Sequence, residues 1–168
     1  MSKKVVFEGR LLKIVTEKKR LPNGHISSLE IVQHPGAVLI VPFITKTKVI
    51  LLKQYRPVID KYIYELPAGT KEKNEKPSVC AKRETVEEIG YYPKRITKLG
   101  EIVPVPGYST ERITIYKAED LIKKEKANQP DEIIESIIVT RVEVLNLFRQ
   151  GLIIDAKTIC AFAMCRWL

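Results

Sequence analysis

The stretch that decides the fold is residues 69–91, which read GTKEKNEKPSVCAKRETVEEIGY. Pro77 and Ser78 are typical of a helix start, and Gly90 is typical of a helix end. The sequence therefore predicts a helix over about residues 77–89.

This helix carries a cluster of glutamates. Glu84, Glu87 and Glu88 fall within a sector of roughly 100° on a helix that advances about 100° per residue. The apolar side chains lie broadly opposite: Val79, Val86 and Ile89. We therefore expect one acidic face and one face that packs against the core.

Carboxylates held this close together repel one another, and a hard divalent cation among them removes that conflict. Magnesium takes oxygen ligands, retains several waters and is usually held by a few carboxylates together with phosphate oxygens of the substrate. Manganese fits a similar set of ligands. The alternative is a solvated acidic face next to Lys82 and Arg83.

The spacing of the fixed positions favours the metal site, because it resembles the signature of the Nudix hydrolases. That signature reads Gly, five residues, Glu, seven residues, Arg-Glu, an aliphatic residue, any residue, Glu-Glu, any residue, Gly and an aliphatic residue. The matching positions are Gly69, Glu75, Arg83, Glu84, Glu87, Glu88 and Gly90. Thr85 and Tyr91 replace aliphatic residues, and neither change removes a charged group. We refer to residues 69–91 as the box.

Segments outside the box resemble the ADP-ribose pyrophosphatase branch of this family. They are Gln54-Tyr55-Arg56, Glu65-Leu66-Pro67-Ala68-Gly69 and Pro104-Val105-Pro106-Gly107-Tyr108-Ser109-Thr110-Glu111. In that branch a proline follows the last glycine of the box by about sixteen residues, and Pro106 stands at that distance from Gly90.

The order of predicted elements indicates an α+β protein. Apolar and β-branched segments predict strands at residues 4–17, 26–33, 36–44, 48–56, 62–66, 95–104, 112–118 and 134–141. Residues 142–150 and 155–168 look helical, and Asp155 is a candidate N-cap. The turn signal at residues 21–24 would make residues 4–33 a hairpin. The resemblance implies a Nudix-type α/β/α sandwich with a mixed central sheet and an N-terminal antiparallel sheet.

Length and composition predict a compact cytoplasmic enzyme. At 168 residues the chain is expected to be one domain, 1–168. The family resemblance implies that about residues 1–40 form an N-terminal β-hairpin region that contributes to dimerisation and that residues 41–168 form the catalytic core. No apolar run approaches a membrane span of roughly 18 residues. The three cysteines are expected to be free thiols. The net charge of +9 could steer an anionic substrate, and the scattered lysines without interleaved aromatics argue against a nucleic-acid surface.

The resemblance implies roles for individual residues. Glu84 and Glu88 are the main metal ligands, Glu87 is a further or water-mediated ligand, and the carbonyl of Ala68 is another donor. Arg83 and Glu75 hold loop and helix together through an ion pair, with Gly69 and Gly90 as structural glycines of the box.

For the remaining roles, the resemblance points to residues outside the box. The general base is a glutamate of a loop after the box, for which we select Glu132, with Asp131 or Glu135 as alternatives. Arg56 would bind the diphosphate, although it could equally end its strand in a surface ion pair. Pro106, Gly107 and Glu111 would lie near the terminal ribose.

These expectations combine into Mg²⁺-dependent hydrolysis of ADP-ribose to AMP and ribose 5-phosphate by a homodimer. One alternative is another Nudix specificity, for a nucleotide sugar, NADH or a dinucleoside polyphosphate. The other is a non-enzymatic regulator that senses ADP-ribose. Such regulators tend to lose glutamates of the box, whereas this chain keeps them.

Overall fold

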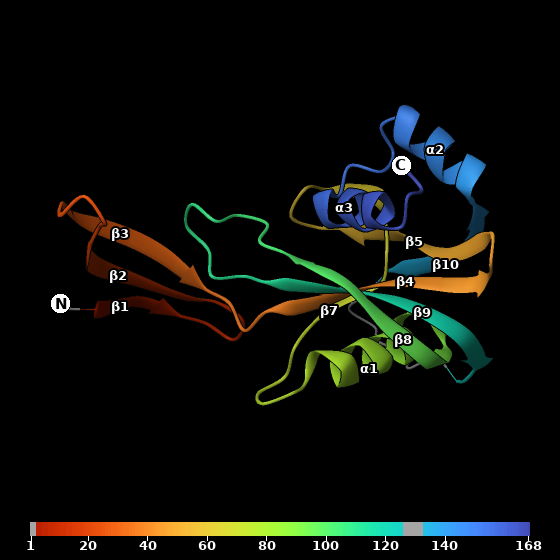
Figure 1. Ribbon diagram of the computed structural model, residues 1–168, viewed down its shortest axis with the longest axis horizontal. Coiled ribbons are helices and arrows are strands. Elements are labelled where there is room, and N and C mark those ends of the chain that lie inside the picture. Colours follow the sequence, from red (N-terminus) through yellow and green to blue (C-terminus); the bar gives the residue numbers. More distant parts are fainter. Residues whose placement is uncertain (1–2, 126–132) are drawn as a thin grey trace.

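The computed structural model describes residues 3–125 and 133–168, and within them a sandwich of helices and sheet lies beside a separate N-terminal sheet (Figure 1). The strands are β1 (Lys3–Glu8), β2 (Lys13–Arg20), β3 (Ile26–Gln33), β4 (Ala37–Thr45), β5 (Lys48–Arg56), β6 (Lys61–Glu65), β7 (Ala68–Thr70), β8 (Tyr91–Ile102), β9 (Ile113–Lys123) and β10 (Ile134–Thr140). The helices are α1 (Pro77–Ile89), α2 (Arg141–Arg149) and α3 (Ala156–Met164).

The central sheet has seven strands and is mixed. Its main order is β10-β5-β4-β9-β8, with β6 paired to β5 and β7 paired to β4. The β4–β9 pair is parallel and the other pairs are antiparallel. The predicted α/β/α sandwich with a mixed sheet is therefore confirmed.

Strand β4 explains why helices cover both faces of this sheet. Residues 37–43 are all buried, so neither face of the strand meets solvent. Leu39 and Val41 pack with Phe162 of α3, whereas Val38 and Ile40 pack with Ala81 of α1. The alternation follows from the two-residue period of a strand, and Figure 1 shows α1 on one side of the sheet with α2 and α3 on the other.

Helix α1 begins and ends where the sequence predicts. Pro77 occupies its first turn, and Gly90 adopts a left-handed φ of 70° at the C-cap, where its N–H bonds to carbonyls of the last turn. Glycine takes this conformation without the strain that a Cβ would add.

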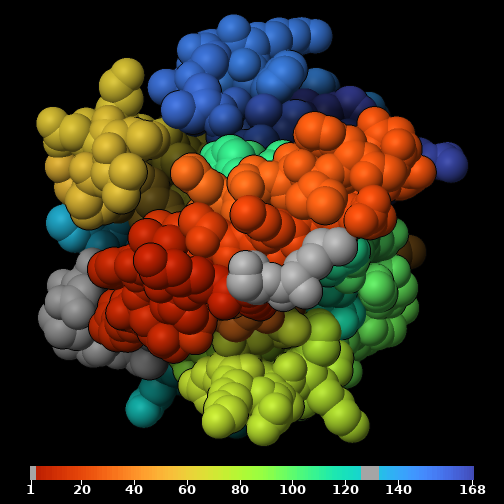
Figure 2. Space-filling model, turned by 90° about the vertical axis from the view of Figure 1, so that its left-hand side faces the viewer, coloured from red at the N-terminus to blue at the C-terminus, as the bar shows by residue number. Residues whose placement is uncertain are grey.

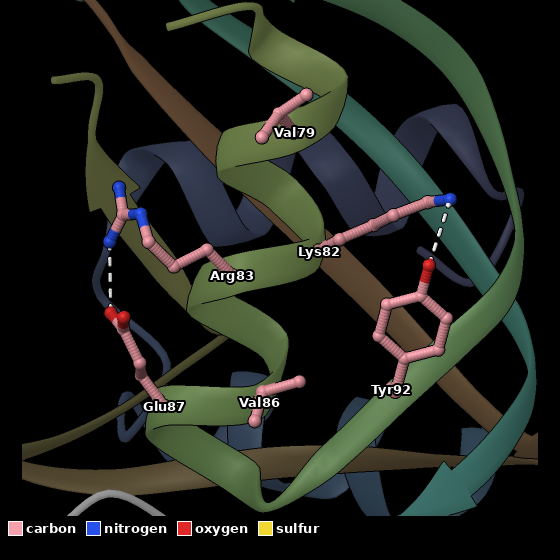
Figure 3. Close-up of a pocket in the computed structure, with 6 residues that line it drawn as sticks. All are labelled: Val79, Lys82, Arg83, Val86, Glu87 and Tyr92. Atoms are coloured by element: carbon pink, nitrogen blue, oxygen red, sulfur yellow. Dashed lines mark hydrogen bonds and ion pairs between the residues drawn. The ribbon is translucent and has the colours of Figure 1, made fainter.

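The prediction of which face of α1 packs was confirmed for Ile89, which packs with Ile50 and Leu52, and was wrong for Val79 and Val86. Glu84 and Glu88 face the sheet and are buried together with Cys80, Ala81 and Thr85, whereas Val79 is 53% exposed. Val79 and Val86 instead line an outer groove of about 560 Å³ with Lys82, Arg83, Glu87 and Tyr92, and Figure 3 shows Lys82 reaching from α1 to Tyr92 of β8. The amphipathic rule fails here because small side chains on the inner face leave space for the two carboxylates.

The N-terminal region differs from the predicted hairpin in having three strands, in the order β1-β2-β3. The predicted turn joins β2 to β3, where the N–H of Gly24 bonds to the carbonyl of Leu21. A second turn, in which the Gly9 N–H bonds to the Leu12 carbonyl, divides the first predicted strand. Residues 9–12 carry little turn chemistry except one glycine, so the sequence pattern did not show this break.

The two C-terminal helices are capped by side chains. Thr140 and Glu143 form a capping box at α2, and the Asp155 carboxylate accepts the Thr158 N–H at α3, as predicted for Asp155. Helix α3 ends at Met164, earlier than predicted. Of the helices described, none has the length and apolar character needed to cross a bilayer.

The cysteines are free thiols, as predicted. Cys80 lies on the inner face of α1, and burial raises the pKa of its thiol to about 12, with a further contribution from Glu75. Burial likewise raises the pKa of Cys165 to about 11. These pKa values describe packing residues that stay protonated at neutral pH.

Candidate active site

The carboxylates of α1 lie against strand β7, and Gly69 leaves the space for one of them. A Cβ built on Gly69 would lie 1.8 Å from the Cδ atom of Glu84, so any side chain here would displace that carboxylate. Glu88, one turn further along, accepts a hydrogen bond of 2.9 Å from the N–H of Ala68. The local sequence thus fixes both carboxylates in the interior. We refer to Glu84, Glu87 and Glu88 as the acidic wall.

Arg83 ties this wall to the loop before the helix. Its Nη1 donates to Glu84 Oε1 at 2.7 Å and to Glu87 Oε2 at 2.9 Å. Its Nε and Nη2 donate to the two carboxylate oxygens of Glu75, each at 3.0 Å. Hydrogen bonds from Arg83 hold the pKa of Glu75 at about 2, below its ordinary value of 4.5, and the same bonds raise the pKa of Arg83. The predicted ion pair between Arg83 and Glu75 is present.

A second charged group lies on the other side of β7. Glu65 is fully buried, and its carboxylate accepts two hydrogen bonds from Arg56, from Nε at 2.7 Å and from Nη2 at 2.8 Å. Lys157 of α3 donates to the same carboxylate at 2.8 Å and to Asp155 at 2.8 Å. Burial opposes the charge of Arg56, but the bonds and charge of Glu65 outweigh it, so the pKa of Arg56 is raised. We refer to Arg56 and Lys157 as the cationic wall.

One cavity of about 230 Å³ has the cationic wall and strand β7 in its lining. It is lined by Ala37, Val38, Arg56, Ala68, Gly69, Thr70, Glu111, Ile113 and Lys157. Ala68 and Gly69 are the residues that contact Glu88 and Glu84, so these two carboxylates lie next to that part of the lining, whereas Glu87 lines the outer groove. The charge of Glu88 also contributes to the raised pKa of Arg56.

The rim of the cavity is formed by the segment that leads into β9. Glu111 is partly exposed, and its Oε1 lies 3.8 Å from Nδ1 of His34. Because that Nδ1 accepts the N–H of Gly36, it does not donate to Glu111. The Glu111 carboxylate is therefore available to hydrogen-bond donors that enter the cavity.

The residues of the acidic wall suit a divalent cation. Their donors are oxygen atoms, two of the carboxylates are buried, and Gly69 creates the space in which Glu84 lies. Within residues 3–125 and 133–168 no group of three or more His, Cys, Asp or Glu side chains is arranged to hold a metal ion by itself. Arg83 instead lies between Glu84 and Glu87 and balances their charge. The acidic wall therefore suits an ion that takes waters and substrate oxygens as its remaining ligands.

Other predicted site residues lie further from the cavity. Pro106 and Gly107 are exposed in the loop between β8 and β9 and do not line it. Glu135 is exposed on β10, opposite Lys53. The selected base, Glu132, and its neighbour Asp131 lie outside the described residues.

Sequence reasoning assigned no role to Glu65 or Lys157. Glu65 was noted only as part of the lead-in to the box, and Lys157 lies 92 residues further along the chain. A signal was present at Lys157, because a lysine in the first turn of a helix opposes the helix dipole. Such departures from local preference are frequent at functional sites.

Comparison with known proteins identifies the family. The NUDIX domain model matches residues 33–162. The methanol dehydrogenase activator of Bacillus methanolicus is 39% identical over 93% of this chain and 85% of its own length, and the ADP-ribose pyrophosphatase of Bacillus subtilis (strain 168) is 36% identical over 94% and 86%. The crystal structure of an ADP compounds hydrolase shares the fold, with a TM-score of 0.84 at 21% identity over 99% of this chain and 90% of that chain. The chain therefore belongs to the NUDIX family of hydrolases.

Proposed function

We propose that the protein hydrolyses the diphosphate bond of ADP-ribose, giving AMP and ribose 5-phosphate, with Mg²⁺ as cofactor. The observation that carries the proposal is the cavity lined by the cationic wall, by Glu111 and by Ala68 and Gly69, the two residues that contact Glu88 and Glu84. Guanidinium and ammonium groups recognise phosphate oxygens, and a carboxylate accepts hydrogen bonds from sugar hydroxyls. The similarity to an ADP-ribose pyrophosphatase supports this substrate.

Nudix hydrolases generally use divalent metal ions, and in this chain Glu84, Glu87, Glu88 and the carbonyl of Ala68 would hold one. When bound, such an ion neutralises diphosphate charge and activates a water molecule. Arg83 orients two of these carboxylates through its hydrogen bonds to Glu84 and Glu87.

The remaining residues bind and orient the substrate. Arg56 uses two of its five N–H donors on Glu65, which leaves three for oxygens of the diphosphate. Glu111 accepts hydrogen bonds from the terminal ribose, and Pro106 and Gly107 shape the loop that reaches it.

Glu132 serves as the general base. Glu132→Gln should lower kcat and Glu135→Gln should not. If kcat falls in Glu135→Gln and stays unchanged in Glu132→Gln, the general base is Glu135.

The protein is proposed to act as a homodimer that forms through its N-terminal sheet. Figure 2 shows β1 and the loop after it in red at the front of the molecule, and apolar side chains of this N-terminal region are exposed. They are Val5, Val6, Phe7, Leu11, Leu12 and Ile26. Exposed patches of this kind typically mark protein interfaces. Light scattering should give a dimer mass for the wild-type protein and a monomer mass for Val6→Asp combined with Phe7→Asp, and a monomeric wild-type protein would contradict the proposal.

The substrate is tested with Mg²⁺ and a panel of nucleoside diphosphate derivatives. ADP-ribose should have the highest kcat/KM among ADP-ribose, NADH, a nucleotide sugar and a dinucleoside polyphosphate. A clear preference for one of the others would refute the substrate and leave the hydrolase assignment in place.

The variant Glu88→Gln separates an enzyme from a sensor. Its amide oxygen can still accept the N–H of Ala68, so the fold should persist while the charge is lost. We expect kcat to fall by at least about a hundredfold, because a buried charge at the reacting group is removed. Glu119→Gln is the matched control, since Glu119 is a half-buried, ion-paired carboxylate on β9 outside the cavity. A protein that binds ADP-ribose without turnover, in wild type and variant alike, would be a sensor.

A second candidate function is activation of methanol dehydrogenase. It is favoured by the 39% identity to the activator from Bacillus methanolicus. The test adds this protein and ADP-ribose separately to a purified methanol dehydrogenase and measures its rate. Stimulation that Glu88→Gln abolishes would link that effect to the same active site.

A further inference from the structure

Lys157 is placed where a helix does not favour a lysine. It follows the N-cap Asp155 by two positions, in the first turn of α3, where the positive end of the helix dipole favours acidic residues. Its side chain is only 19% exposed, so its ammonium group is also partly withdrawn from water. Both features are unfavourable for an isolated lysine, and both require a specific local partner.

Glu65 provides that partner, but Glu65 alone does not require Lys157. The two oxygens of Glu65 already accept two hydrogen bonds from Arg56, which is enough to balance its single buried charge. A second cation on the same carboxylate is therefore in excess of what Glu65 needs. Asp155, the other partner of Lys157, restores neutrality to the group.

The ammonium group retains capacity to bind a ligand. Within the described part of the chain Nζ makes two hydrogen bonds, to Glu65 and Asp155, out of the three it can donate. Lys157 lines the same cavity as Arg56, and the other lining residues nearest the acidic wall are Ala68 and Gly69. An anion in this cavity would meet two cations on one side and, on the other, the backbone of Ala68 and Gly69, which contacts Glu88 and Glu84.

We infer that Lys157 binds a phosphoryl oxygen of the substrate's diphosphate through Nζ, next to Arg56. The inference rests on the proposed function, and it adds to the box a residue from the C-terminal helix. Glu65 holds both cations against the cavity, so the two donors present a fixed arrangement to the diphosphate. Because fixed donors lose little freedom on binding, such an arrangement favours affinity.

The experiment compares Lys157→Met and Lys157→Arg with the control Lys117→Met. Lys117 is also a partly buried lysine in an ion pair, 2.7 Å from Glu119, but it lies on β9 away from the cavity. Thermal unfolding of each variant shows whether it is folded. Calorimetric titration with methylenediphosphonate and Mg²⁺ measures binding of a diphosphate that cannot be hydrolysed, and steady-state kinetics with ADP-ribose measure kcat and KM.

Loss of one charge-assisted hydrogen bond should weaken methylenediphosphonate binding by about tenfold to a hundredfold in Lys157→Met. KM for ADP-ribose should rise by a similar factor, Lys157→Arg should recover most of the affinity, and Lys117→Met should stay within about twofold of wild type. Equal affinities in Lys157→Met and Lys117→Met would overturn the inference, as would a wild-type protein that does not bind the probe.

The two proposals can fail separately in this experiment. If the wild-type protein binds methylenediphosphonate through Lys157 but does not hydrolyse ADP-ribose, the substrate proposal fails and the role of Lys157 holds. If ADP-ribose is hydrolysed and Lys157→Met behaves like the control in both assays, the role of Lys157 fails and the substrate proposal holds.

Discussion

The two walls are each organised by one residue of the opposite charge. Arg83 bonds to Glu84 and Glu87 in the acidic wall and to Glu75 in the loop before the helix, and Glu65 bonds to Arg56 and Lys157 in the cationic wall. The environments of the two residues differ. The side chain of Arg83 is 25% exposed, whereas that of Glu65 is fully buried.

This difference in burial predicts different contributions of the two walls to stability and to catalysis. Solvent screens the Arg83 cluster in part, and its carboxylates can also be balanced by a bound cation. The Glu65 cluster is more deeply buried, and its charges are balanced mainly by one another, with a smaller contribution from Glu88 to Arg56. We therefore expect the cationic wall to matter more for folding and the acidic wall more for catalysis.

The largest effect on stability should come from Glu65→Gln. It leaves Arg56 and Lys157 close together without the buried anion between them, and breaking a buried ion pair in this way costs about 3 to 5 kcal/mol. Urea unfolding at neutral pH measures the change. Glu119→Gln is the control, because Glu119 also pairs with two cations, Lys117 and Arg95, but is partly exposed. A loss no larger than in the control would show that the two walls do not differ as described.

The next effect tests the acidic wall by titration. The pKa of Glu75 is lowered from 4.5 to about 2 by Arg83, so its ionised form stabilises the folded state above the unfolded pKa. That contribution is fully present above about pH 4.5 and is lost as the pH falls towards about 2, and it amounts to at most about 3 kcal/mol. Urea unfolding at several pH values should show this loss in wild type and not in Glu75→Gln. Parallel pH profiles in the two proteins would contradict the role of Arg83 as the organising cation.

Gly69→Ala should separate catalysis from stability. The new methyl group would lie 1.8 Å from Glu84 Cδ, and the flexible end of that side chain can move away at little cost to the fold. A displaced carboxylate should lower kcat by about a hundredfold, since a shift of about 1 Å in an active site has effects of that size. Gly100→Ala is the control, because its methyl group would meet only the tip of Met164 at 3.2 Å. Unchanged kcat in Gly69→Ala would mean that the position of Glu84 is not critical.

Much of the acidic wall could be predicted from the sequence because its parts are close along the chain. Pro77 and Gly90 define the ends of α1, and the resemblance of Glu75 and Arg83 to the Nudix signature implies their ion pair. The face of α1 that packs could not be predicted from amphipathicity, because that rule assumes that charged side chains face water. At this site Glu84 and Glu88 face inward.

The cationic wall required the folded structure. Arg56 was recognised as a candidate for diphosphate binding, but the contact that fixes it, with Glu65, depends on the pairing of β5 with β6. Lys157 reaches Glu65 from 92 residues away. No periodicity or short motif encodes a contact over that separation, so only the unusual lysine in the first turn of α3 could have suggested it.

The smallest effect concerns Asp155, which serves both the helix and the cationic wall. Its Oδ2 caps α3 by accepting the Thr158 N–H, and its Oδ1 accepts a hydrogen bond from Lys157. Asparagine caps helices about as well as aspartate, so Asp155→Asn should lose only the contact with Lys157 and lower stability by less than about 1 kcal/mol.

Asp155→Ala removes the cap as well, and should lower stability by about 1 kcal/mol more than Asp155→Asn. KM for ADP-ribose should change little in Asp155→Asn, because Glu65 still holds Lys157 in place. If Asp155→Asn instead raised KM as much as Lys157→Met does, Asp155 would be the residue that fixes the lysine. The buried carboxylate of Glu65 would then organise Arg56 alone, and the cationic wall would consist of two independent pairs.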